Sequence, residues 1–132
     1  MANPDKLPLY LIFFDQQKYF YLLVRNFPKE YKYTLGQAIL DLGWKVLDAV
    51  IAANKVANQA KPPKILQISE YFDRLKNRLR MSYELKLISN ARYAVIIEAN
   101  EETGKMISGW LKWARNAEAL AERTEQSEKP KA

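Results

Sequence analysis

The sequence contains neither cysteine nor histidine in its 132 residues. Without cysteine it can form no disulfide and no thiolate metal site, and nothing in it points to an oxidising compartment. Without histidine, the usual general bases, common zinc sites, haem ligation by histidine and the Glu-x-x-His di-iron pattern are also excluded. An enzyme of this composition would depend on carboxylates, lysines or tyrosines alone. We therefore expect no catalytic residue, no metal site and no cofactor.

Long apolar runs are also scarce. The N-terminal run from Leu7 to Phe14 is too short to span a bilayer and contains Pro8. It lacks the basic segment and the small-residue cleavage site of a secretory signal. We expect a cytoplasmic protein that does not associate with membranes.

Acidic residues are sparse in one part of the chain. The net charge is +6, and residues 61–92 carry eight basic but only three acidic side chains. The centre of this segment is RLKNRLR, residues 74–80, in which cations alternate with apolar side chains. This quarter of the chain should create a positive field of its own.

Apolar residues recur with helical spacing in four segments, and hydrophobic residues make up 48% of the chain. Helices are expected at about 9–26, 34–60, 63–88 and 90–116, separated by Pro28, by the Pro62–Pro63 pair and by Ser89 as an N-cap. The expected fold is all-α, an antiparallel up-and-down four-helix bundle over residues 1–117. Residues 118–132 are polar, and we expect a disordered tail there.

The second predicted helix has two apolar faces. One seam runs from Leu35 to Ala60, and a second set points in nearly the opposite direction. The second face indicates either a broad core or a contact between subunits. Under the second interpretation, the oligomer interface consists of Leu40, Trp44, Leu47 and Ile51.

Glycine is rare, and all four glycines fall in or at the edges of predicted helices. A glycine inside a helix costs about 1 kcal/mol relative to alanine, so its presence invites a packing explanation. We expect close helix packing where a small-residue pattern lies in the fourth helix; it consists of Gly104, Ser108, Gly109 and Trp110. The alternative is that these glycines are merely tolerated.

The cations of the third helix admit two interpretations. Spacing places Lys76 and Arg80 on one flank of the core-facing leucines, and Arg74 and Arg78 on the other. They could form ordinary surface pairs with neighbouring acids, as at Glu70–Arg74, or they could bind phosphates, to which arginine is well suited. The surplus continues beyond RLKNRLR at Lys61, Lys64, Lys86 and Arg92. No sequence-reading motif accompanies these cations, so any nucleic-acid binding should be directed at the backbone.

Three stretches together resemble one known family. They are FPKEYKYTLGQAI (27–39), LRMSYELKLIS (79–89) and EETGKMISGWLKW (101–113). In this order and spacing they are similar to the four-helix-bundle proteins related to Avd, the accessory variability determinant of diversity-generating retroelements. The resemblance covers about residues 8–115.

The resemblance implies a basic, ring-shaped homopentamer, prokaryotic or phage-encoded, without an active site. Members bind the retroelement's reverse transcriptase and nucleic acid, template RNA or DNA, with low sequence specificity, and support mutagenic retrohoming. Charge and position then suggest which side chains bind nucleic acid or the polymerase: Arg74, Lys76, Arg78, Arg80, Lys86 and Arg92.

Two alternatives remain open at this stage. A related branch, encoded within intervening sequences of 23S ribosomal RNA genes, shares the fold, but its typical second-helix pattern Ile-Pro-Ala-Asn-Ile-Ala-Glu-Gly is replaced here by LDLGWKVLDAVIAAN (40–54). Such a protein would be a stand-alone oligomer with a structural or RNA-associated role. An enzyme based on Glu98, Glu101 and Glu102 is the weaker alternative, because these carboxylates lack a partner base.

Overall fold

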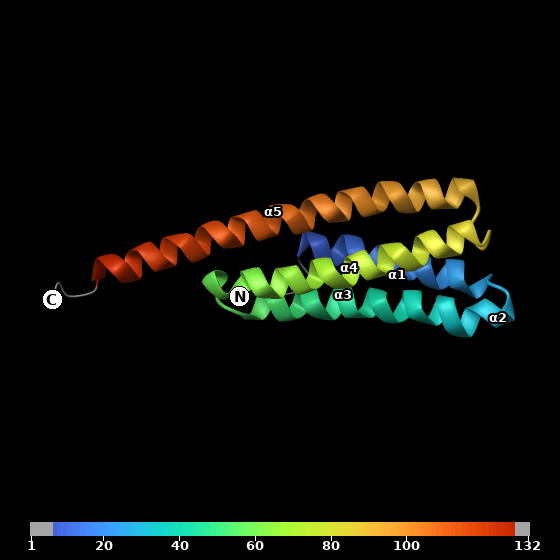
Figure 1. The fold of residues 1–132 in the computed structure, drawn as a ribbon, viewed down its shortest axis with the longest axis horizontal. Coiled ribbons are helices and arrows are strands. Elements are labelled where there is room, and N and C mark those ends of the chain that lie inside the picture. Colours follow the sequence, from blue (N-terminus) through green and yellow to red (C-terminus); the bar gives the residue numbers. More distant parts are fainter. Residues whose placement is uncertain (1–6, 129–132) are drawn as a thin grey trace.

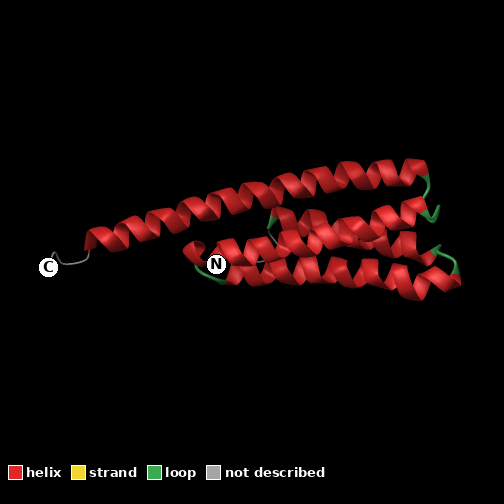
Figure 2. Ribbon diagram, in the orientation of Figure 1, coloured by secondary structure: helices red, strands yellow, loops and turns green. Residues whose placement is uncertain are grey.

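The computed structural model describes residues 7–128, all of whose regular structure is helical (Figures 1 and 2). The four long helices are α1 (Pro8–Arg25), α3 (Gln37–Lys55), α4 (Lys61–Glu84) and α5 (Asn90–Glu128). A short α2 (Lys29–Tyr31) and a π-helical turn (Lys32–Gly36) precede α3, and a 3-10 turn (Asn58–Ala60) precedes α4. The all-helical prediction is confirmed. No helix within residues 7–128 has both the length and the apolar character needed to cross a bilayer.

Each long helix runs opposite to the previous one (Figure 1). Helix α3 packs against both α1 and α4, and α5 packs against both α4 and α1. The apolar stripe of α4 from Ile65 to Leu79 is entirely buried, as are Phe13, Phe20 and Leu23 of α1. At the centre, the ring of Phe13 meets the rings of Phe20 and Phe72 edge to face, with centroids 6.4 and 6.2 Å apart. Each such buried side chain contributes about 1.5–3 kcal/mol through burial.

The predicted subunit face of α3 needs correction. Leu40 and Leu47 are buried in the core of the single chain, and Ile51 is partly buried. The reason is that α3 has a neighbour on two sides, α1 and α4, so it needs two apolar faces within one chain. Only Trp44 remains exposed, at 40%, and its Nε1–H donates to the Tyr21 hydroxyl at 2.9 Å.

Helix α3 ends at Lys55, before the predicted end at residue 60, because Val56 adopts an extended backbone. Lys61, expected to be part of the basic surface, is instead buried behind this end, with 6% of its surface exposed. Its Nζ donates to the carbonyl oxygens of Ala53 (2.7 Å), Asn54 (3.2 Å) and Val56 (2.8 Å). It thus caps α3, where a cation interacts favourably with the helix dipole. Burial lowers the pKa of the Lys61 ammonium.

Helix α5 does not stop near residue 116 but continues to Glu128, past the ends of the other helices (Figure 1). Residues 117–128 are rich in alanine and glutamate and contain no glycine or proline, so their intrinsic preference is helical. The rest of the predicted tail, residues 129–132, lies outside the described residues, as do residues 1–6. Along α5, Ile96 and Thr103 are buried, Trp110 is half-buried, and Trp113 is 47% exposed.

Close helix packing was predicted at the glycines of α5, and this prediction was wrong. A Cβ at Gly109 would meet no atom within 4 Å, and one at Gly104 would meet only Phe72 Cε2, at 4.0 Å. Ser108, between them, is exposed. The close approaches occur instead at the other two glycines. A Cβ at Gly36 would lie 2.6 Å from Val24 Cγ1, and one at Gly43 would overlap with the side chain of Gln17.

Candidate nucleic-acid interface

The basic surface of the bundle follows from the periodicity of α4. Ile65, Ile68, Phe72, Leu75 and Leu79 occupy the core-facing stripe and are all buried. The cations between them must therefore face outward, and the structure places all four in solvent: Arg74, Lys76, Arg78 and Arg80. Sequence periodicity alone was sufficient to place this row of cations.

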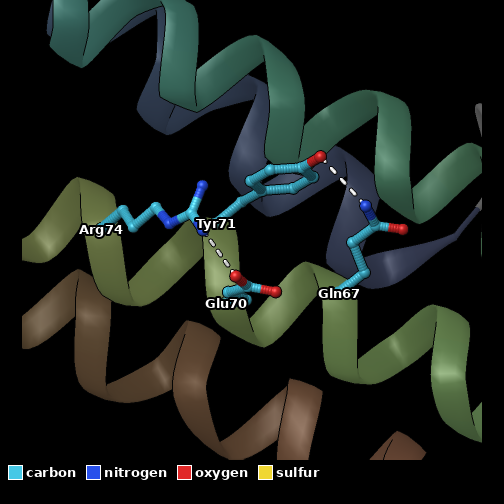
Figure 3. Close-up of polar contacts among 4 residues, drawn as sticks. All are labelled: Gln67, Glu70, Tyr71 and Arg74. Carbon is cyan, nitrogen blue, oxygen red and sulfur yellow. Dashed lines mark hydrogen bonds and ion pairs between the residues drawn. The ribbon is translucent and has the colours of Figure 1, made fainter.

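Three of these four cations have an acidic neighbour on the same helix. Arg74 Nη2 lies 2.6 Å from Glu70 Oε1 (Figure 3), and Lys76 Nζ lies 3.2 Å from Asp73 Oδ1. Arg80 Nε is 3.4 Å from Glu84 Oε1. All these pairs are exposed, so each contributes only a few tenths of a kcal/mol. Such weak pairs leave the cations free to bind a competing anion at little cost.

Arg78 has no carboxylate partner within 4 Å among the residues that the structure describes. It lies on the same flank of α4 as Arg74, whose guanidinium is 5.9 Å from the centroid of the Tyr71 ring. The ring of Tyr71 reaches from α4 toward α3 (Figure 3), and Lys45 of α3 lies 5.8 Å from its centroid. This flank thus combines three cations with one aromatic ring.

The remaining two predicted cations lie in the turn between α4 and α5, which holds Lys86, and in the first turn of α5, which holds Arg92. Lys86 has a φ of 63°, the left-handed conformation in which glycine is usual, and the following N–H of Leu87 donates to the Ser82 carbonyl at 2.9 Å. Ser89 caps α5 as predicted, since its Oγ accepts from the N–H of Arg92 at 3.2 Å. Lys86 and Arg92 are both exposed. All six predicted cations are therefore accessible; four lie on α4, Lys86 lies in the turn and Arg92 lies at the start of α5.

Sequence reasoning missed an exposed apolar stripe on the outer side of α1. Leu11, Phe14 and Leu22 are 50%, 37% and 52% exposed, and Tyr21 is 47% exposed beside Trp44. Their spacing is helical, so the pattern was readable in the sequence. It was hidden because the opposite face of the same helix is equally apolar and aromatic. Exposed apolar patches of this kind are typical of contact surfaces.

Comparison with known families gives a decisive result. The sequence model of the bAvd-like family matches residues 13–114, most of the chain. The chain belongs to the bAvd-like family. The match spans all of α4, the α4–α5 turn and most of α5 of this bAvd-like protein, and so includes all six exposed cations. No curated protein and no solved structure matched the chain.

Proposed function

We propose that this bAvd-like chain is a non-catalytic accessory protein of a diversity-generating retroelement. In the cytoplasm of a prokaryotic host, it would hold the reverse transcriptase together with template RNA or DNA and thereby support mutagenic retrohoming. Membership of the family supports the accessory role. The basic surface of α4 and the α4–α5 turn supports contact with nucleic acid.

The observation that carries the proposal is the row of exposed cations on α4. Three of the four are arginines, whose planar guanidinium binds phosphate oxygens in a bidentate manner. Their present partners are weak surface carboxylates, which phosphates can displace. Binding of this kind releases counterions and falls steeply with salt, and it carries little sequence information.

Assembly into a ring would repeat this basic surface around the particle. The face best suited to a subunit contact is the exposed stripe of α1, together with Trp44 of α3. It replaces the interface predicted from sequence, of which only Trp44 remains exposed and Ile51 partly accessible. Because affinity rises steeply with the number of neutralised phosphates, a homopentamer would bind nucleic acid far more tightly than one chain.

The test measures the mass of the purified protein by light scattering, followed by binding to labelled RNA over a salt series. We expect a five-subunit particle whose affinity decreases steeply with salt. Replacing Arg78 and Arg80 by alanine should weaken binding and reduce the slope of log K against log[salt] by about 0.7 to 0.9 for each phosphate that the variant no longer neutralises.

A matched control removes two cations from the outer face of α5. Lys105→Ala with Lys112→Ala changes the net charge by the same amount at exposed positions away from α4. If this control weakened binding as much as the α4 variant, net charge rather than the α4 surface would be responsible. A monomer that ignored RNA at low salt would overturn the proposal and leave a structural role.

A further inference from the structure

A hollow of about 350 Å³ lies in the groove between α4 and α5. Its size is at the lower end of the range for small-molecule sites, about 300–1,000 Å³. It lies on the flank of α4 that carries Lys76 and Arg80, which places it within the basic surface. The lining residues are Lys76, Tyr93, Ile97, Asn100, Glu101 and Gly104.

Asn100 is the unusual member of this lining. It is 7% exposed, and among the described residues no hydrogen-bond donor reaches its buried Oδ1. A buried acceptor without a donor costs about 1–3 kcal/mol, so such a group calls for an explanation. The Asn100 side-chain amide carries both a donor and an acceptor and can rotate about its terminal bond. It can therefore offer its N–H or its carbonyl oxygen to a group that enters the hollow.

The aromatic wall of the hollow is held rigidly. The ring of Tyr93 stacks on that of Tyr83, with centroids 4.2 Å apart and planes within 7°. The hydroxyl of Tyr83 in turn donates to Asn90 Oδ1 at 2.7 Å, which ties this pair to the start of α5. A rigid aromatic wall beside an amide favours a flat ligand that has hydrogen-bonding groups at its edge.

Gly104 supplies the space. A Cβ there would meet only Phe72 Cε2 at an ordinary contact distance of 4.0 Å, so packing does not require glycine at this position. The ammonium of Lys76 stands at the rim, 4.8 Å from the centroid of the Phe72 ring and 3.2 Å from Asp73. A cation at the mouth, an aromatic wall and a buried amide are the elements that bind a phosphate, a base plane and a base edge.

We infer that the hollow receives one unpaired base of a single-stranded nucleic acid, with the adjoining phosphate at Lys76. This inference rests on the proposed function, because it assigns a site for a base within the proposed nucleic-acid surface. A base in a duplex is stacked and paired and cannot enter. The protein should therefore favour single strands, and bases should add to the affinity that the phosphates provide.

The experiment compares two single-stranded oligonucleotides of about 12 nucleotides, one intact and one abasic, which carry the same number of phosphates. The full chain should bind the intact strand roughly tenfold more tightly, the effect of stacking one base. Gly104→Leu should abolish this preference, since a leucine side chain on a helix points toward the preceding turn and would fill the hollow between Tyr93 and Asn100. Its affinity for the abasic strand should not change.

Gly109→Leu is the matched control, because it makes the same substitution on the same helix where nothing lies within 4 Å. It should retain the roughly tenfold preference. Thermal unfolding of both variants checks that each is folded. The inference would be overturned if the two variants showed the same preference for the intact strand, or if the unaltered chain showed none. The proposed function would still stand in that case, provided that binding remained dependent on salt. Failure of the unaltered chain to bind either strand would overturn both.

Discussion

The contact between α1 and α3 and the contact between α4 and α5 both contain helical glycines, but for opposite reasons. Gly43 of α3 faces the side chain of Gln17, with which any Cβ would overlap. Gly104 of α5 faces an open hollow, and a Cβ there would make only an ordinary contact. A helical glycine destabilises either helix by about 1 kcal/mol relative to alanine. Close packing explains why glycine is present at position 43, but it does not explain the glycine at position 104.

The buried amide of the first contact also links its two helices. The Nε2–H of Gln17 crosses from α1 to donate to the Leu40 carbonyl of α3 at 2.9 Å, which links the two helices. The Oδ1 of Asn100 in α5 receives no hydrogen bond from any described residue. The α1–α3 contact is therefore closed and bonded. The Oε1 of Gln17 also receives no hydrogen bond from any described residue, so an unused acceptor is common to both contacts. What distinguishes the α4–α5 contact is its open space, which suits a surface that binds something else.

The largest change in stability is expected when a methyl group is added to the tightly packed α1–α3 contact. Gly43→Ala should lower the free energy of unfolding by about 1–3 kcal/mol, because the new methyl group displaces Gln17 from its hydrogen bond. Urea unfolding measures the change. In a double-mutant cycle, Gln17→Ala should restore space for the methyl group, with a coupling energy of about 0.5–3 kcal/mol. Simple additivity of the two substitutions would show that they do not compete for the same space.

At the α4–α5 contact we expect a smaller change in the free energy of unfolding, and this change is stabilising. Asn100→Leu should raise the free energy of unfolding by about 1 kcal/mol, because it replaces a buried acceptor without a donor by an apolar group of similar volume. The exposed Asn77 of α4 provides the control, since Asn77→Leu should add only a few tenths of a kcal/mol through helix propensity. Marked destabilisation by Asn100→Leu would mean that the amide is already satisfied in the folded protein.

Features that depend on one helix alone could be predicted from the sequence. The buried stripe of α4 and the exposure of the four cations between Arg74 and Arg80 follow directly from a period of 3.6 residues. Features that depend on a neighbour could not. The two apolar faces of α3 do not reveal whether the second neighbour is α4 or another subunit, and the sequence does not show that Lys61 lies beside the carbonyls that end α3.

In the candidate site, too, the features of a single helix could be predicted and those that depend on two helices could not. Its cations were predicted from charge and spacing, and five of them lie on or just beyond one helix. The hollow was not predicted, although Gly104, Tyr93 and Ile97 could be assigned to one face of α5 from their spacing. What that face encloses depends on how far α4 stands from it. The distance between two helices is set by side chains of both, which no single-helix pattern contains.

The smallest change in stability is expected from glycine-to-alanine substitutions in α5. These substitutions test most directly whether packing requires glycine in the α4–α5 contact, as it does in the α1–α3 contact. Gly104→Ala and Gly109→Ala should each raise the free energy of unfolding by about 0.5–1 kcal/mol, because alanine favours the helix and both methyl groups have room. Thermal or urea unfolding of the two variants alongside Gly43→Ala checks this. Stabilisation of similar size at both positions would show that folding does not require glycine at 104. Its presence would then need a functional reason, such as the space it leaves for a ligand, whereas destabilisation by Gly104→Ala alone would show that α4 and α5 approach more closely than the hollow implies.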